Sequence, residues 1–400
     1  MPSVFKFLFP KDKELFSTIF VLATPVIISN ISRVLMGVID MAMIGHLGGS
    51  AIAAVGMAGM VTWTVMSLGI ALRTGTQTIV SRRLGQKLYD QCGLAMRNMQ
   101  FFGLLIGIPV TILTYFNTYF IMSFFIDNST DAFRLCIDYA KYGFLGTYFI
   151  YVTFIFQGFY TGIEETKIHM KTTIAANILN LYLNVGLIFG TEAVILFFEG
   201  TPFFVLSFFW KIFYFPELGV KGAAIGTFIA IIWQCIHYFI YLFNQNIKKK
   251  YDVFNFCFDY QLLKRQLIIA YPIAFQETFV MLSITIFYKI LGIIGIAQLA
   301  ATQVIFKIMH ASFMPAIGVG QACATLVGKY LGEENPDKAE TAINESLRGS
   351  FIIMGSVGIL FASFSQNIIP IFTNDTEVIK YAIPGLRFIG LLQFLDAICF

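Results

Sequence analysis

The sequence predicts an all-α, polytopic membrane protein made of two parallel repeats of helices. Of its 400 residues, 57% are hydrophobic and only 12% are charged, whereas soluble domains carry about a quarter of charged residues. Apolar runs of the roughly 20 residues that a membrane-spanning helix needs recur along the whole chain. None of them alternates with the period of two that a membrane β-barrel requires.

Hydropathy and helix-breaking residues place the spans in order along the chain. We predict ten helices, with ends uncertain by about two to four residues. Their expected ranges are 16–44, 52–80, 99–125, 133–159, 170–189, 219–243, 263–294, 296–327, 342–372 and 378–400. The aromatic stretch Val194 to Gly219 is too interrupted to span a bilayer, so we expect an interfacial hairpin on the outer side.

An internal repeat sets the domain organisation. The stretch "GHLGGSAIAAVG" from Gly45 resembles "GIIGIAQLAATQ" from Gly292, an offset of 247 residues (292 − 45). Because six predicted helices lie within one repeat, both copies keep the same orientation, related by an axis along the membrane normal. The same offset aligns Pro25 with Pro272, Gly85 with Gly332, and Asp90 with Asp337.

The repeat predicts two lobes with a cleft between them, which is a transporter architecture. We expect a six-helix lobe over residues 1–245, a polar cytoplasmic linker over 246–262, and a second lobe over 263–400. The second lobe holds only four of the six helices that the repeat requires. The sequence is therefore expected to be truncated or to come from a shortened protein.

Basic residues predict the orientation, because Lys and Arg near helix ends resist translocation. They gather in alternate loops, as in "KKK" at Lys248 to Lys250, whereas the intervening loops read "IDNSTD" and "FTNDTE". We expect a multi-pass protein of a bacterial inner membrane or its equivalent, with a cytoplasmic amino terminus. No signal peptide is seen, since the first apolar run is too long.

Several function classes find no support in the residues. The six cysteines include no C-x-x-C pair and the four histidines have no metal spacing, so we expect neither metal nor cofactor. No nucleophile is paired with a base, so we expect no enzyme. The expected partners are small drug-like molecules and membrane lipids, without nucleic acid, and the chain is expected to be a monomer.

One acid, Asp40 in "GVIDMAMIGHLGG", lies within the first span. Placing a carboxylate at membrane depth costs about 2.5–3.5 kcal/mol on insertion scales, so such a residue is expected to be functional. Loss of hydration favours its protonated form. Ser29, Ser32, Arg33 and Gly37 extend a polar stripe from it. There are two alternatives for Asp40. It could form an ion pair with Arg33, or it could lie close enough to the outer interface to stay hydrated.

A second polar stripe lies on the fifth predicted helix. Asn177, Asn180 and Asn184 recur at i, i+3 and i+7, so their amides face one side. An amide can donate to an ionised carboxylate and accept from a protonated one. The stripe is therefore a candidate partner of Asp40. The alternative is packing between helices, worth about 0.6 kcal/mol for each hydrogen bond.

The chain resembles the multidrug and toxic compound extrusion (MATE) transporters over nearly its whole length. The segments that carry the resemblance include "VIDMAMIGHLG", "ANILNLYLNVGLIFG", "GVKGAAIGTFIA", "MPAIGVGQACATLVGKYLG" and "LLQFLDA". The pattern around Asp40 is more similar to the DinF-like branch than to the NorM-like one. The resemblance implies an antiporter that exports amphipathic, often cationic drugs and toxic compounds, driven by inward flow of H+ or Na+.

The resemblance also implies a cation-coupling site at Asp40, Asn180, Asn184 and Thr227. Similar members carry an Asn four residues before an acidic residue on the fifth helix and a Thr on the sixth. This chain has Asn184 in place of that acid. The lost negative charge favours H+, carried by Asp40 alone, over Na+.

The second lobe and the cleft supply weaker candidates. Glu277 lies five residues after Pro272, whereas the NorM-like acid lies eight after its proline, where Val280 stands here. The alternative role for Glu277 is that of a carboxylate that packs between helices or lies at the lipid interface. Asp396 matches a NorM-like acidic position. The possible cleft residues are Asn177, Glu277, Asp396 and Met36.

The sequence leaves two functions other than drug export open. A lipid-linked oligosaccharide flippase of the same superfamily would need several cationic residues in the cleft, and only Arg33 and Arg73 qualify. Arg73 lies late in its predicted helix, so we expect it to reach the cytoplasmic surface. A truncated, non-transporting membrane protein is the other alternative.

Overall fold

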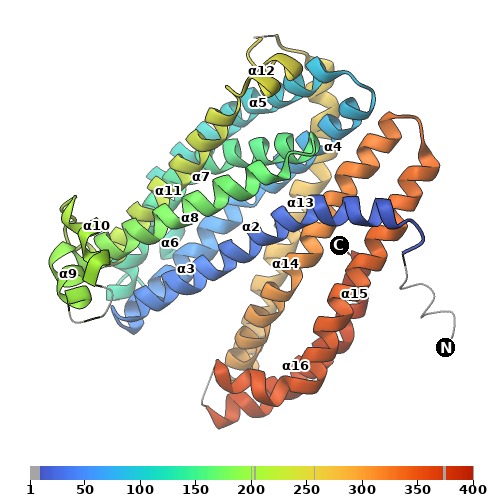
Figure 1. Ribbon diagram of the computed structural model, residues 1–400. Helices are drawn as coiled ribbons and strands as arrows, with labels where there is room; N and C mark the ends of the chain where they lie inside the picture. Colours follow the sequence, from blue (N-terminus) through green and yellow to red (C-terminus); the bar gives the residue numbers. More distant parts are fainter. Residues whose placement is uncertain (1–9, 200, 202–203, 256, 373–374, 400) are drawn as a thin grey trace.

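The computed structural model describes residues 10–199, 201, 204–255, 257–372 and 375–399, and every regular element in those ranges is a helix. Figure 1 shows their arrangement. The α-helices are α2 (Lys13–Gly45), α3 (Gly49–Met66), α4 (Leu68–Gly85), α5 (Tyr89–Phe116), α6 (Thr118–Ser123), α7 (Asp131–Gly162), α8 (Thr166–Phe189), α9 (Thr191–Glu199), α10 (Phe208–Lys211), α11 (Gly219–Tyr241), α12 (Gln245–Tyr251), α13 (Tyr260–Ile294), α14 (Ile296–Gly332), α15 (Pro336–Ile368) and α16 (Thr376–Cys399); the 3-10 helices are η1 (Phe204–Ser207) and η2 (Ile369–Ile371).

Polar side chains fix several helix starts. Asp12 accepts a hydrogen bond from the backbone of Leu15 at the start of α2, and Thr130 accepts one at the start of α7. Asp259 and Asn335 do the same for α13 and α15. Each cap satisfies a backbone N–H that the helix itself leaves without an acceptor.

All ten predicted spans are helical, and the protein is a multi-pass membrane protein. In the described ranges nine segments are long and apolar enough to cross a membrane, with α3 and α4 forming one segment interrupted only by the turn residue Ser67. The helix predicted over 133–159 forms as α7 but is not among the nine. Its residues from Tyr151 to Gly162 are all buried, and it contacts α3, α4, α5 and α11. A helix enclosed by protein does not need an apolar surface toward lipid.

The predicted aromatic hairpin is helical. It consists of α9, η1 and α10, and many of its aromatic side chains are exposed. Phe198 stacks on Trp210 with ring centroids 5.5 Å apart, and the Trp210 indole donates to the Tyr182 carbonyl of α8 at 3.1 Å. The hairpin is thus attached to the membrane-spanning bundle, while its apolar face stays open, as expected for an interfacial element.

The helices form two groups (Figure 1). The blue to green helices, α2 to α11, lie together, and the orange to red helices, α14 to α16, form a second group that spreads away from the first toward the bottom of the view. Between the groups, α2 packs on α14, and α4 packs on α13 and α14.

The repeat found in the sequence recurs in the packing. A Cβ added to Gly85 would lie 1.9 Å from the carbonyl oxygen of Lys329, and one added to Gly332 would lie 2.2 Å from that of Arg82. Lys329 follows Arg82 by the same offset by which Gly332 follows Gly85. The ends of α4 and α14 therefore cross backbone against backbone, and only glycine permits that approach.

The turns after these two helices also correspond. Lys87 has a φ of 60° and Glu334 a φ of 58°, both in the left-handed region that non-glycine residues seldom adopt. The two residues are separated by the repeat offset. The correspondence of unusual backbone at equivalent places indicates that the two copies end these helices in the same way.

Side chains join the two groups near the same crossing. The Gln77 amide donates to the Gln321 carbonyl and to the Thr325 hydroxyl, both at 2.9 Å. The Lys329 ammonium forms an ion pair with Glu164, in the turn after α7, at 2.9 and 3.0 Å. These contacts lie toward the ends of α4, α7 and α14, where the basic loops are.

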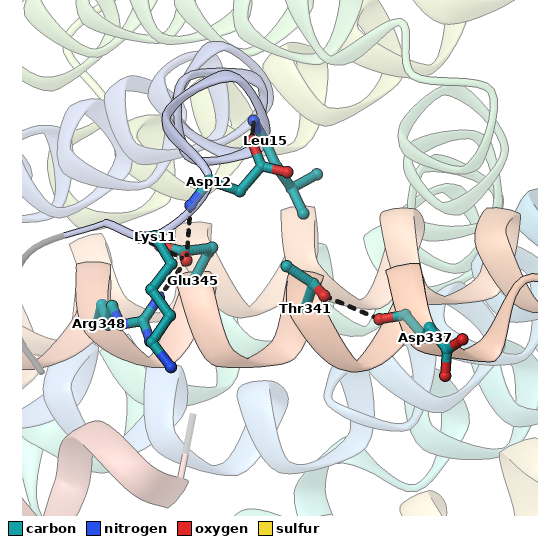
Figure 2. A network of polar contacts seen from close by, with 7 residues as sticks. All are labelled: Lys11, Asp12, Leu15, Asp337, Thr341, Glu345 and Arg348. Carbon is teal, nitrogen blue, oxygen red and sulfur yellow. Dashed lines mark hydrogen bonds and ion pairs between the residues drawn. The ribbon is translucent and has the colours of Figure 1, made fainter.

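The start of the chain is tied to the second group at this end as well (Figure 2). Glu345 of α15 is fully buried and accepts hydrogen bonds from the backbone N–H groups of Lys11 at 3.0 Å and Asp12 at 3.2 Å. The same carboxylate forms an ion pair with Arg348, which is 3% exposed. Together with the α4–α14 crossing, this network places the contacts between the groups at the end that carries the basic loops.

The predicted linker over 246–262 is more ordered than a loose connection. Its first half is the helix α12, which packs on α5. The side-chain amide of Asn98 donates to the Asp259 carbonyl at 2.8 Å and its oxygen accepts from the Asp259 N–H at 3.3 Å. Gly93 approaches the Tyr251 carbonyl so closely that a Cβ would lie 1.9 Å from it. The polarity of the stretch gave no sign of its attachment to α5, and its role as a cytoplasmic linker stays a prediction.

Candidate functional site

The structure brings the four predicted coupling residues into one hydrogen-bonded chain. The Asn184 amide nitrogen of α8 donates to Asp40 Oδ1 of α2 at 2.9 Å and to Asn180 Oδ1 at 3.3 Å. The Asn180 amide in turn donates to the Thr227 hydroxyl of α11 at 3.3 Å. Three helices that are distant in sequence thus converge on one carboxylate.

Burial differs along this chain of residues. Asn184 is fully buried and Asn180 is 5% exposed, whereas Asp40 is half-buried. One side of the carboxylate therefore contacts the protein network, and the other remains accessible. Such a group can exchange a proton with water while its amide partners stay fixed.

The Asn184 amide suits both protonation states of Asp40. Its nitrogen donates to the carboxylate, while its Oδ1 is buried and has no hydrogen-bond donor within the described part of the chain. The orientation of an amide is assigned from its hydrogen bonds, and a rotation exchanges donor and acceptor. A protonated Asp40 can therefore donate to the oxygen that is otherwise left without a donor.

Two glycines of α11 allow this approach, and the sequence interpretation missed them. A Cβ added to Gly226 would lie 2.1 Å from Asn184 Oδ1, and one added to Gly222 would lie 2.2 Å from the Leu187 carbonyl oxygen. Their four-residue spacing is the small-residue pattern that brings membrane helices close together. That spacing was the signal available in the sequence.

We expect Gly226→Ala to impair coupling without unfolding the protein. The added methyl group displaces the Asn184 amide, and a hydrogen bond to a charged group is worth about 1.5–3 kcal/mol. Efflux driven by a pH gradient should fall about tenfold, measured in vesicles. The matched control is Gly56→Ala, because a Cβ there meets no atom within 4 Å. Equal efflux by the two variants would contradict the role of this contact.

Tyr139 of α7 is a further neighbour that the sequence did not single out. It packs against the apolar cluster of Met36, Ile188 and Val220, which come from the same three helices as the network. No spacing rule marked it among the many tyrosines of α7. The site is thus built from four helices, α2, α7, α8 and α11.

The predicted cleft residues are not gathered around Asp40. The Asn177 amide donates to the Ser32 hydroxyl of α2 at 2.7 Å, so it joins α2 to α8. Met36 is 7% exposed and packs in an apolar cluster with Ile188 and Val220. This face of α2 packs against α8 and α11, and the place of Met36 in the cleft stays a prediction.

The two acids of the second half lie apart from the Asp40 network. Glu277 of α13 and Asp396 of α16 are both half-buried. Within the described ranges, neither makes a hydrogen bond with the four coupling residues. Their role in the cleft stays a prediction.

The arginines differ from both sequence interpretations. Within the described residues Asp40 forms no ion pair with Arg33, so the predicted alternative for Asp40 finds no support. The Arg73 guanidinium lies over the Phe154 ring, 5.9 Å from its centroid, and its Nε is buried. The expected snorkelling of Arg73 was wrong because α4 continues to Gly85, which leaves Arg73 far from the helix end.

The chain matches the model of a known protein family over most of its length. The family model described as MatE matches residues 25–185 and 272–400, which together make up more than half of the chain. The chain belongs to the MatE family. The two matched segments of this MatE protein begin at Pro25 and Pro272, the pair that the sequence repeat aligned.

Relatives of this MatE chain match over most of its length. A "Probable multidrug resistance protein NorM" of Thermotoga maritima is 26% identical over 399 residues, covering 99% of this chain and 81% of the relative. The "Multidrug resistance protein NorM" of Vibrio parahaemolyticus is 25% identical over 394 residues, covering 96% and 80%. A solved structure described as an outward-facing multidrug resistance MATE family transporter has a TM-score of 0.82 at 21% identity, covering 96% and 80%.

Proposed function

We propose that this MatE protein is a proton-coupled antiporter that exports amphipathic, often cationic drugs and toxic compounds. The carrying observation is the half-buried Asp40 held by the Asn184 amide. A carboxylate at membrane depth is costly, and such residues commonly serve ion or proton pathways. The names of the NorM relatives support drugs as the substrate class.

The chemistry of the site favours H+ over Na+ as the coupling ion. The network contains one carboxylate, and its other members are the neutral groups Asn180, Asn184 and Thr227. A sodium ion is held by several oxygen ligands and gains from more than one negative charge. A proton needs only one basic oxygen and a partner that accommodates both states, which the Asn184 amide provides.

The arrangement of the helices suits alternating access. We infer a six-helix lobe over residues 1–245, the connection over 246–262, and a second lobe over 263–400. Contacts between the lobes lie at the end with the basic loops. With that end in the cytoplasm of an inner membrane, the lobes are closed inward and open outward, in a DinF-like monomer surrounded by lipid.

Transport by the purified protein tests the coupling ion. We expect liposomes that contain it to move a cationic dye such as rhodamine 6G when a pH gradient is imposed in sodium-free buffer. A sodium gradient at constant pH should drive no movement, because the site offers a single carboxylate. Transport that requires Na+ and does not depend on the pH gradient would contradict proton coupling. Absence of dye movement under both gradients would contradict export.

A further inference from the structure

Three arginines meet at one cavity outside the Asp40 network. The cavity has a volume of about 280 Å³ and lies at the end of the protein that carries the basic loops. Its lining residues are Ile79, Arg82, Arg83 and Gln86 of α4 and Arg265 of α13. None of these described lining residues is an acid. The cavity therefore concentrates positive charge between two helices that are distant in sequence.

The packing of α4 on α13 fixes the place of these arginines. A Cβ added to Gly75 of α4 would lie 2.9 Å from the carbonyl oxygen of Gln266 on α13. The buried Gln266 amide donates to the Ala95 carbonyl of α5 at 3.0 Å. Arg265 precedes Gln266 directly. Arg82 follows Gly75 by seven residues, which is two turns along the same face of α4. The cavity is thus a product of close helix packing.

The three guanidinium groups have no ionic partner in the part of the chain that the structure describes. No carboxylate there lies within 4 Å of Arg82, Arg83 or Arg265. The Arg83 guanidinium donates to the side-chain oxygen of Gln86 at 2.7 Å, which is a neutral acceptor. Asp259, the acid at the start of α13, accepts hydrogen bonds from the first backbone N–H groups of that helix instead. A bound anion would supply the charge that these cations lack.

Topology and helix dipoles explain only part of this arrangement. Arg82 and Arg83 lie in the last turn of α4, where the helix dipole stabilises cations. Arg265 lies near the start of α13, where the dipole gives a cation no such gain. Basic loops set the orientation of a membrane protein, but orientation does not require that basic residues meet at one cavity. An anion between the two helices relieves their mutual repulsion.

A second, more apolar hollow follows on α13. It has a volume of about 350 Å³ and is lined by Tyr260, Lys264, Leu267, Ile268 and Tyr271. Ile268 lies three residues after Arg265, so the two side chains are neighbours on the helix surface. Ile268 is 62% exposed and Tyr271 is 66% exposed. A ligand with its anionic group at Arg265 can therefore place an apolar chain along the same helix.

We propose that the three arginines bind the phosphate group of an anionic phospholipid, whose acyl chain lies along Ile268 and Tyr271. A guanidinium presents a planar set of donors that matches phosphate oxygens, and basic pockets between membrane helices suit lipid headgroups. The adjoining apolar hollow favours a lipid over free phosphate, which needs only the cations. The inference goes beyond the proposed export and does not depend on it, because binding requires neither drug nor gradient.

Lipid binding by the whole chain tests the site. The protein is freed of lipid in detergent and titrated with phosphatidylglycerol or phosphatidylcholine, and bound lipid is measured by native mass spectrometry. The unmodified protein should bind phosphatidylglycerol about tenfold more tightly than phosphatidylcholine. Arg82→Gln, Arg83→Gln and Arg265→Gln should each weaken phosphatidylglycerol binding about fivefold, because each removes one charge that attracts the anionic lipid. Phosphatidylcholine binding should not change.

Lys249→Gln is the matched control. Lys249 is exposed on α12, in the basic loop before α13, and lines neither hollow. The variant loses the same charge as each arginine variant and should bind phosphatidylglycerol as the unmodified protein does. Equal weakening by Lys249→Gln and the arginine variants would show that the general charge of this end attracts the lipid, and would overturn the proposal.

Chemical protection of the unmodified protein keeps the test decisive if a glutamine variant fails to fold. Phosphatidylglycerol should protect Arg82, Arg83 and Arg265 from phenylglyoxal, as read by mass spectrometry of peptides. Arg134, which is exposed on α7, should react equally with and without the lipid. Reaction of the three arginines that phosphatidylglycerol does not slow would overturn the proposal.

A photoreactive lipid distinguishes a phospholipid from free phosphate at this site. Phosphatidylglycerol with a diazirine in its acyl chain should label the α13 peptide that contains Ile268 and Tyr271, and Arg265→Gln should lower that labelling about fivefold. Inorganic phosphate should protect the arginines from phenylglyoxal much less than phosphatidylglycerol does. Equal protection by inorganic phosphate, with no labelling of the α13 peptide, would identify a site for free phosphate and overturn the lipid assignment.

Discussion

Asp40→Asn should reduce pH-driven drug efflux to the level of vesicles without the protein. The asparagine keeps the shape and hydrogen-bonding capacity of Asp40 but cannot exchange a proton. Expression and folding should be preserved, because a neutral amide at membrane depth costs less than a carboxylate. The measurement is dye efflux from energised vesicles, with the amount of inserted protein determined in parallel.

Glu277→Gln serves as the comparison for this variant. It makes the same chemical change in the other lobe, at a carboxylate outside the Asp40–Asn184 network, and it should reduce efflux much less. If Asp40→Asn retains the coupling of the unmodified protein, Asp40 has a structural role and the assignment fails. If efflux ceases only when Na+ is withdrawn, the coupling ion has been assigned wrongly.

Glu345→Ala should destabilise the protein more than any other single carboxylate change. Breaking a buried ion pair by removing one partner costs about 3–5 kcal/mol. Here the change also removes the acceptor of the Lys11 and Asp12 backbone N–H groups, which hold the start of α2 against α15. The free energy of unfolding, measured by chemical denaturation in mild detergent, should fall by about that amount.

Glu340→Ala is the matched control, since Glu340 is exposed on the same helix. Its free energy of unfolding should change by less than about 0.5 kcal/mol. Glu345→Gln should lie between the two, because the amide oxygen can still accept the backbone hydrogen bonds. Equal stability of Glu345→Ala and Glu340→Ala would show that the buried Glu345 carboxylate does not hold the start of α2 against α15.

Local patterns predicted most of the fold. Apolar length predicted ten helices that all form, nine of them among the candidate spans of the described residues, and the offset between Pro25 and Pro272 anticipated the matching crossing of Gly85 and Gly332. The interruption at Ser67 was missed, because no proline or glycine run marks it. The helix α12 was missed because a short polar helix owes its stability to packing on α5, which a local pattern does not contain.

The site was predictable where spacing implies a shared face. The Asn180 and Asn184 stripe was correctly expected to approach Asp40, since i and i+4 side chains point the same way. Which neighbour covers the face of α2 that carries Met36 depends on tertiary packing, so the sequence did not show that Met36 packs with Ile188 and Val220. Arg73 was misplaced because the predicted end of its helix fell short of Gly85.

Proton release on drug binding tests the central claim, that Asp40 carries the coupling proton, most directly. The purified protein is mixed with tetraphenylphosphonium in weakly buffered, sodium-free detergent solution, and the pH change is recorded against the amount of drug bound. The unmodified protein should release protons as the drug binds, and Asp40→Asn should bind the drug without releasing any. Proton release from Asp40→Asn equal to that of the unmodified protein would contradict the account.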